Sequence, residues 1–277
     1  MKRVLLLALT SAAIATTTAA PTARPRIVSL APSATEVLFE AGAGALVVGV
    51  TNHCRFPREA LSLPKVGAYL TPSYEALLAL KPDLVVTVPE QSDLEPKLTA
   101  LKIPILRLDH RSLDGIIRSL EQVGRCCGAE ASAMRAAEAL RRTLAEARRI
   151  ASDPPPRTLI CFGRAEDFRR LYAAAPGTVH DDLITHAGGV NVLTSPAVAY
   201  PTMSAEGVMR LDPDVIIEFS SRDGDAETLR RQWQRLDSVR AVRNGRVHVF
   251  TGEFLSVPGP RFVRLAARIA RAIRGDE

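Results

Sequence analysis

The stretch SYEALLALKPDLVV at 73–86 returns at 204–217 as SAEGVMRLDPDVII, 131 residues further along the chain. In each copy a serine precedes a short helical pattern, and a Pro-Asp pair then leads into an apolar run typical of a buried strand. The positions identical in register are Ser73/Ser204, Glu75/Glu206, Leu80/Leu211, Pro82/Pro213 and Asp83/Asp214. A helix-to-strand unit that occurs twice predicts two halves of the same α/β architecture.

Strand and helix patterns alternate on both sides of the chain centre. The expected strands are RIVSLA, LVVGV, DLVVTV and PILRLD before residue 128, and RTLICFG, DVIIEFS and RVHVF after Pro156. Short apolar runs separated by helices are typical of parallel sheets with helical crossovers. We expect a helix over SATEVLFEAG, with Ser33 as N-cap and Gly42 as its stop, and further helices near 178–187, 204–211, 225–240 and 260–274.

Residues 129–152 differ from both halves. Ala133, Ala137, Leu140 and Leu144 recur at spacings of three and four, and no glycine or proline interrupts the run before SDPPPR. This pattern predicts one long amphipathic helix. The expected fold is therefore α/β, with two Rossmann-like lobes, each built on a central, mainly parallel sheet, joined by that helix. We expect lobes at 24–128 and 154–277 and a connecting helix at 129–153, which would permit only small openings.

The first residues are typical of a secretory signal peptide. Lys2 and Arg3 precede an apolar run that is too short to span a membrane, and small residues follow it. We expect removal of about residues 1–23, with the cleavage point open. Because the first cysteine is Cys54, no lipid anchor is expected, and the mature chain should be free in the periplasm.

Composition and motifs exclude several classes of protein. The chain has 277 residues, 47% of them hydrophobic, and 36 Lys and Arg against 30 Asp and Glu. Its arginines are scattered over helix faces, so no nucleic-acid partner is expected. The four cysteines lack CxxC spacing, which gives no support to a structural zinc site and leaves disulfide pairing open. No HExxH, GxSxG or P-loop motif occurs, and the sequence predicts no enzyme.

The repeated glutamates have two interpretations. Glu75 and Glu206 each lie in the first turn of a predicted helix, where a carboxylate is favoured by the helix dipole. They can therefore serve helix stability alone. Alternatively, two exposed carboxylates, one per lobe, can meet two basic sites on a two-fold symmetric partner, since opposite charges set the register of docking.

Loops that follow strands are the expected lining of a cleft between the lobes. The candidate ligand-binding residues are His53, Cys54 and Arg55 in TNHCRFP, Tyr69 and Tyr200 beside the two repeats, and Glu253 and Phe254 in GEFLS. His53 and Cys54 are side chains of metal-binding type, but no further ligands are spaced to complete an ion site. The remaining histidines, at 110, 180, 186 and 248, are interpreted as structural.

The segments RIVSLAPSATEVLFEAG, KVGAYLTPSYEALLALKPDLVV and AYPTMSAEGVMRLDPDVII, with the long helix, resemble one known group of proteins. They are similar to substrate-binding proteins of ABC importers of the cobalamin and ferric-siderophore type, over about 26–274. The likeness is greatest to periplasmic cobalamin-binding proteins. It implies binding and delivery without chemistry or cofactor, by a monomer that docks Glu75 and Glu206 on arginines of a transmembrane permease dimer.

The resemblance also implies ligand contacts and shows departures from them. Tyr69, Tyr200 and His53 match aromatic contacts to a corrin ring, and Glu253 matches an acidic contact. Val257 and Val88 stand where the relatives have a contacting arginine and tryptophan, and His186 stands at one of their two disulfide cysteines. The ligand is expected to be a metal chelate, and a corrinoid is the first candidate. Haem, a ferric siderophore and a bare metal remain alternative ligands. A chelatase-like enzyme remains an alternative function.

Overall fold

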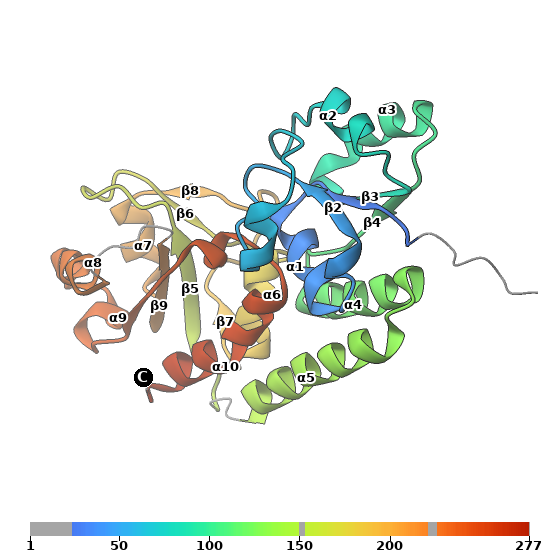
Figure 1. Ribbon diagram of the computed structural model, residues 1–277. Coiled ribbons are helices and arrows are strands. Elements are labelled where there is room, and N and C mark those ends of the chain that lie inside the picture. Colours follow the sequence, from blue (N-terminus) through green and yellow to red (C-terminus); the bar gives the residue numbers. More distant parts are fainter. Residues whose placement is uncertain (1–23, 150–152, 221–225, 277) are drawn as a thin grey trace, which may run out of the picture.

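The computed structural model describes residues 24–149, 153–220 and 226–276. Two α/β halves lie side by side, and helices α5 and α10 run beneath them in the view of Figure 1. The expected signal peptide lies outside the described residues. Among the described helices, none has both the length and the apolarity needed to cross a membrane.

The first sheet has four short parallel strands in the order β2-β1-β3-β4. They are β1 (Ile27–Ser29), β2 (Val47–Val50), β3 (Leu84–Thr87) and β4 (Ile105–Arg107), and each was predicted from its apolar run. Between them lie α1 (Pro32–Glu40), α2 (Tyr74–Ala79) and α3 (Glu95–Ala100), with the short turns η1 (Gly44–Leu46), η2 (Arg58–Ser62) and η3 (Pro89–Leu94). Helix α4 (Leu113–Cys127) follows the last strand.

The second sheet is mixed. Its order is β10-β9-β5-β6-β8, with β7 paired to β5. The predicted strands β5 (Arg157–Phe162), β9 (Val215–Ser220) and β10 (Val247–Thr251) are parallel, whereas β6 (Leu171–Ala173) pairs antiparallel with β5 on one side and with β8 (Thr202–Met203) on the other. The sequence did not predict β6, β7 (Val190–Asn191) or β8, each of which has two or three residues. The expected class, α/β with central, mainly parallel sheets, is confirmed.

The helices of the second half fall where the sequence placed them, with one division. They are α6 (Val179–His186), α7 (Ala205–Leu211), α8 (Ala226–Trp233), α9 (Arg240–Arg243) and α10 (Pro260–Arg274), with the turns η4 (Gln234–Leu236) and η5 (Glu253–Ser256). The single helix expected at 225–240 is thus a helix of eight residues followed by a separate turn and α9.

Each sheet divides its side chains between two cores. Ile27 of β1 and Ile217 of β9 belong to one large cluster, which also contains residues of α1, α4, α5, α6 and α10. Their neighbours Val28 and Ile216 point to the opposite faces, into smaller clusters under α2–α3 and under α7–α9. This division follows from the alternation of side chains along a strand. One continuous core therefore connects both sheets.

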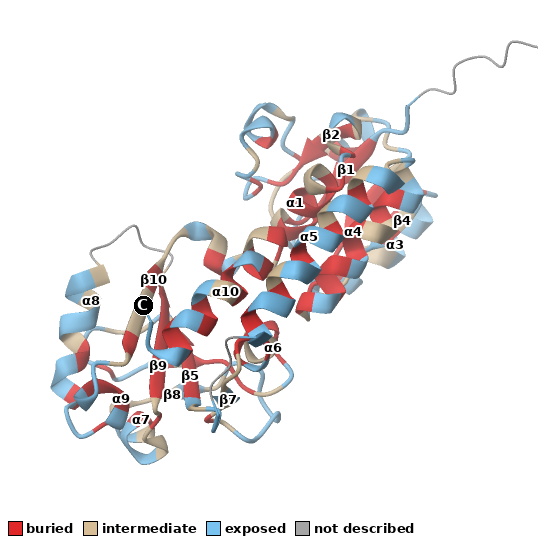
Figure 2. Cartoon of the chain, turned by 90° about the horizontal axis from the view of Figure 1, so that it is seen from below, coloured by how far each residue is buried: buried red, intermediate tan, exposed pale blue. Residues whose placement is uncertain are grey.

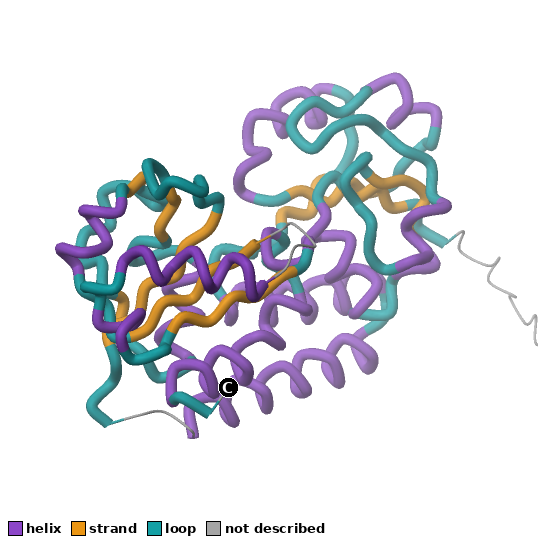
Figure 3. The backbone as a smooth tube through the Cα atoms, turned by 90° about the vertical axis from the view of Figure 1, so that its left-hand side faces the viewer, coloured by secondary structure: helices purple, strands orange, loops and turns teal. Residues whose placement is uncertain are grey.

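Helix α5 (Glu130–Arg149) confirms the predicted long helix over its described length of 20 residues, and 150–152 lie outside the described residues. Its buried positions are the small and branched residues of the predicted stripe, and the alternation of buried and exposed residues is visible in Figure 2. Helix α5 packs against α4 and α10, and α10 in turn contacts α1, α4 and α6. The connection between the lobes is therefore a layer of helices, whereas the sequence predicted a single one. Figure 3 shows this layer below the strands. The expected lobe limits at 128, 153 and 154 stay predictions.

The two copies of the repeat have the same local structure. Ser73 and Ser204 cap α2 and α7 by accepting hydrogen bonds from the backbone N–H groups of Ala76 and Gly207. The equivalent residues Lys81 and Asp212 both have left-handed backbone, with φ of 46° and 41°, and this conformation ends each helix.

The repeated aspartates anchor the first strand of each sheet. The Asp83 carboxylate accepts a hydrogen bond from the backbone N–H of Arg26 at 2.8 Å, and the Asp214 carboxylate accepts one from Arg157 at 2.9 Å. Arg26 and Arg157 directly precede or begin β1 and β5. The aspartate of the repeat therefore has the same role in both lobes, which is to accept a hydrogen bond from the backbone at the start of a strand.

One predicted cap is wrong. Helix α1 begins at Pro32 with Ala31 as its N-cap, so Ser33 lies inside the first turn. Proline fits the first helical position because its missing N–H would have no partner there. Gly42, with φ of 87°, follows the helix as expected. The Ser33 hydroxyl is consequently free to bind another side chain, that of His110.

Replacing Gly124 by alanine should destabilise the protein by about 1–3 kcal/mol, because a Cβ atom there would lie 2.6 Å from the Cβ of Ala133 in α5. This loss exceeds the gain of about 1 kcal/mol that alanine brings to a helix interior. Urea unfolding measures the change, and Arg125→Ala on the exposed side of α4 is the control. Equal stability of wild type and Gly124→Ala would show that α4 and α5 do not need this close contact.

Candidate functional site

Two adjoining cavities of about 610 and 640 Å³ lie between the lobes. They share the lining residues His110, Ser256 and Pro258, so they form one cleft. The residues around it follow the carboxyl ends of strands in both sheets: Ser33 after β1, His53 and Arg55 after β2, Glu90 after β3, His110 after β4, Arg164 after β5, Ser220 at the end of β9 and Glu253 after β10. Ligand sites of open α/β sheets lie at this edge.

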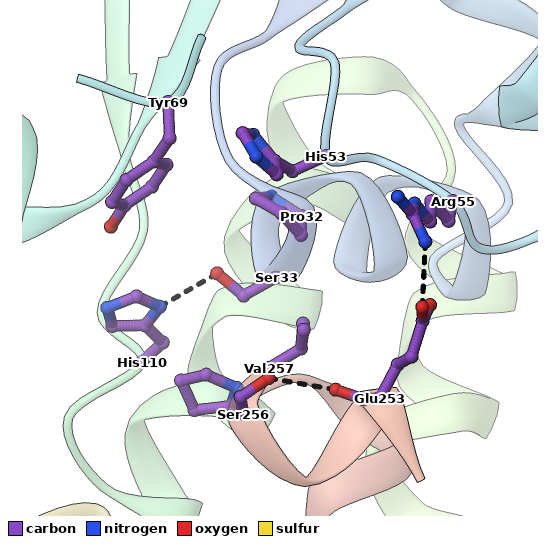
Figure 4. Close-up of a pocket in the computed structure, with 10 residues that line it drawn as sticks. Pro32, Ser33, His53, Arg55, Tyr69, His110, Glu253, Ser256 and Val257 are labelled. Carbon is purple, nitrogen blue, oxygen red and sulfur yellow. Dashed lines mark hydrogen bonds and ion pairs between the residues drawn. The ribbon is translucent and has the colours of Figure 1, made fainter. Parts of the chain in front are cut away.

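Four of the seven predicted ligand residues line the first cavity: His53, Arg55, Tyr69 and Glu253 (Figure 4). Arg55 and Glu253 bind each other at 2.7 Å across the cleft, from loops 198 residues apart. Their side chains are 64% and 59% exposed, so this ion pair contributes at most about 1 kcal/mol. A ligand can therefore break this ion pair and bind either side chain with little loss of free energy.

Cys54 and Phe254 do not line either cavity. The Cys54 thiol is fully buried beside the hydroxyls of Thr35 and Thr51, at 3.1 and 3.2 Å. Phe254 packs against the large core, and the Arg261 guanidinium lies 5.4 Å from its ring centre. The loops were predicted as cleft lining, but the direction of each side chain within them was not readable from the sequence. All four cysteines lie in described parts of the chain, and their thiols are free.

Tyr200 lines the second cavity, together with aromatic residues that sequence reasoning missed. Phe162 stacks on His180 with ring centres 5.4 Å apart, and Tyr200 lies edge-on to Phe162 at 5.5 Å. Tyr172 and Phe219 complete this wall. Phe162 and Phe219 lie in predicted strands, so the signal that could have found them was an aromatic residue at the carboxyl end of a buried strand.

His180 is held in its neutral form. Burial among these rings lowers its pKa to about 4. The wall around it therefore carries no charge at neutral pH and suits the face of a flat apolar group. The sequence interpreted His180 and His110 as structural residues, but both side chains also line the cleft.

A buried ion pair forms part of the second cavity. Arg164 donates from Nε to the Glu218 carboxylate at 3.1 Å, and the two side chains are 1% and 4% exposed. The indole N–H of Trp233 donates to the other Glu218 oxygen at 2.7 Å, and Arg164 also donates to Gln232. Since both charges are paired and hydrogen-bonded, this group fixes the cavity floor and supplies no free charge.

A chain of hydrogen bonds joins three residues at the junction of the two cavities. The Ser33 hydroxyl lies 2.7 Å from Nδ1 of His110, and Nε2 of His110 lies 2.7 Å from a carboxylate oxygen of Glu90. The hydrogen bond from His110 opposes the desolvation of Glu90, and with the charges of His110 and Arg111 it holds the pKa of that carboxyl below its usual value. Glu90 is therefore an anion at neutral pH.

The two predicted docking residues lie outside the cleft. Glu75 and Glu206 are exposed in the first turns of α2 and α7, one in each lobe. Val257 lines the first cavity, whereas Val88 is fully buried. His186 is buried 3.4 Å from Asp182. Within the described residues, no group of three or more His, Cys, Asp or Glu side chains is placed to hold a metal ion.

Comparison with known proteins gives a consistent set of relatives. A vitamin B12-binding protein of Pectobacterium atrosepticum is 30% identical over 260 residues, which cover 91% of this chain and 89% of the relative. The solved vitamin B12-binding protein BtuF of Vibrio cholerae superimposes with a TM-score of 0.78 at 29% identity, over 91% of this chain and 97% of that one.

A haem-binding relative has a similar fold. The periplasmic haem-binding protein RhuT of a Roseiflexus species, solved without ligand, superimposes with a TM-score of 0.74 at 26% identity, covering 91% of this chain and 98% of that one. The model of the periplasmic binding protein family matches residues 27–253, from the first strand to the cleft residue Glu253. With two α/β lobes and a cleft between them, this chain belongs to the periplasmic binding protein family.

Proposed function

We propose that the protein captures a corrinoid, with cobalamin as the first candidate, between its two lobes and delivers it to an ABC importer. The observation that carries the proposal is the pair of tyrosines, Tyr69 and Tyr200, which bring an aromatic side chain from each lobe to one cleft. The volume of each cavity lies within the usual range for small-molecule sites. Because the cavities share lining residues, one larger ligand can occupy both. The similarity to vitamin B12-binding proteins supports this ligand class.

Haem or a ferric siderophore is the second candidate. The observation in its favour is the similarity to a haem-binding protein. The resemblance to cobalamin-binding proteins also implies contacting side chains at positions 88 and 257, where this chain has valines. In either case the ligand is cargo, and we propose no chemical step and no resident cofactor.

We further propose that residues 1–23 direct export and that the mature chain works as a monomer in the periplasm. Its relatives are periplasmic proteins. The partner would be a dimeric transmembrane permease. Glu75 and Glu206 support this partner because they present equivalent exposed carboxylates on the two lobes. Such paired charges set the orientation and rate of docking.

The ligand class is tested by titrating the purified mature chain with cyanocobalamin, cobinamide and hemin. We expect one corrinoid bound per chain, seen by calorimetry and by a shift of the corrin absorption bands. Binding of hemin without either corrinoid would replace the first candidate with the second. Binding of none of them would remove the proposed ligand class.

Tyr69→Ala and Tyr200→Ala should each weaken corrinoid binding about 10-fold or more, because each removes an aromatic face from the cleft. Calorimetry on the folded variants measures the loss. Tyr74→Ala is the matched control, since Tyr74 lies outside both cavities, with the Lys97 ammonium 4.0 Å from its ring centre. Unchanged affinity in both cleft variants would place the ligand elsewhere.

Reversing both docking charges, Glu75→Lys with Glu206→Lys, should abolish uptake in cells that depend on this protein while ligand affinity stays within about 2-fold, since neither residue lines the cleft. The control is Glu138→Lys with Glu146→Lys, which reverses two exposed charges on α5. Normal uptake by the first double variant, or loss of its ligand affinity, would contradict the docking role.

A further inference from the structure

Glu90 lies near the junction of the two cavities of the cleft. It belongs to the turn that follows β3, and it lines the second cavity beside His110, which lines both. The carboxylate influences tyrosines from both lobes: burial first and then Glu90 raise the pKa of Tyr69 to about 12, and the same two causes raise that of Tyr200. Glu90 thus lies where a ligand held between the lobes would meet it.

The hydrogen bonds fix Glu90 as an acceptor. An ionised carboxylate can only accept, so the N–H at Nε2 of His110 donates a hydrogen bond to Glu90. Nδ1 of the same ring shares a hydrogen bond with the Ser33 hydroxyl, which is available because Ser33 does not cap α1. Ser33 and His110 are 4% and 9% exposed, whereas the Glu90 side chain keeps 48% of its surface open. The buried pair holds the carboxylate while a ligand can still reach it.

The other charges of the described lining cancel in pairs. Arg55 binds Glu253, and Arg164 binds Glu218, so among the two arginines and three glutamates of the lining one carboxylate has no arginine partner there. That carboxylate is Glu90, which is held by His110. Arg111 lies near enough to lower its pKa, but the Arg111 guanidinium is hydrogen-bonded to Asp109 at 3.0 Å.

A carboxylate that can only accept hydrogen bonds binds some groups of a ligand and repels others. It gains a charge-assisted hydrogen bond from an amide N–H or an ammonium group, and it repels a carboxylate brought to the same place. Corrinoids carry carboxamides around the ring, whereas haem carries two propionates and catecholate siderophores are anionic.

We propose that Glu90 is a specificity-determining residue, which selects macrocycles bearing peripheral amides and excludes those bearing carboxylates at the same position. The inference rests on the proposed function, since it concerns the ligand of that cleft. It goes further by naming the residue and the chemical feature that decide between the corrinoid and the haem or siderophore candidates.

The test uses ligand pairs that differ only in amide against carboxylate. One pair is cyanocobalamin and each of its monocarboxylic acids, made by hydrolysis of a single side-chain amide, and the other is the bisamide of hemin and hemin itself. Affinities are measured for wild type, Glu90→Gln and Glu95→Gln. Glu95 is the matched control because it lies in the same lobe, outside both cavities, beside Arg107.

For at least one position on the macrocycle, wild type should prefer the amide about 10-fold or more, the effect of gaining a hydrogen bond to a charged group and losing a repulsion. Glu90→Gln should bring that ratio to within about 3-fold of unity, and Glu95→Gln should keep the wild-type ratio. Measuring a ratio separates selection from general loss of fold, because a merely structural defect lowers both affinities alike.

The outcomes separate the two proposals. If the hemin pair binds and the corrinoid pair does not, the corrinoid assignment fails, while the amide-to-acid ratio of the hemin pair still decides the role of Glu90. If ligands bind but wild type shows no preference for amides, or Glu90→Gln keeps the preference, the role of Glu90 is overturned. Binding of neither pair overturns both.

Discussion

The continuous apolar core under both sheets is the constraint on which the rest of this structure depends. Alternate residues of β1 and β9 enter that core, and α4, α5 and α10 contribute to it from the layer of helices beneath the strands. The two lobes share this core, so they cannot separate without exposing its apolar side chains to water. Close-packed interiors also resist deformation. The cleft lies at the carboxyl ends of strands in both sheets, so its two walls are held in register from below.

The repeated segment shows how a structural and a functional requirement can lie in the same residues. Its serine caps a helix, its left-handed residue ends that helix, and its aspartate anchors the start of a neighbouring strand. These roles account for most of the sequence identity between the two copies. The glutamates at 75 and 206 are the part that backbone geometry does not require, since both are exposed and the helix dipole contributes only about 0.3–1 kcal/mol there.

Much of the fold could be predicted from the sequence because the signals are local. Seven apolar runs became strands, and the stripe beginning at Ala133 became α5. The short strands β6–β8 escaped prediction because two or three residues carry no periodicity. Ser33 was misassigned since Pro32 is equally suited to begin a helix, and tertiary contact with His110 gave the serine another partner. In the loops, sequence indicated which segments surround the cleft, but the inward turn of Cys54 and the approach of Glu90 to His110 depend on how distant elements pack.

The ion pair between Arg55 and Glu253 has a consequence for the empty and filled states of the cleft. Each charge has a partner before any ligand arrives, so in the empty cleft the carboxylate and the guanidinium are held as a pair. A ligand that takes Glu253 as its acceptor releases Arg55, which can then serve an acceptor group on the same molecule. Such an exchange of partners changes neither the charge of Arg55 nor that of Glu253.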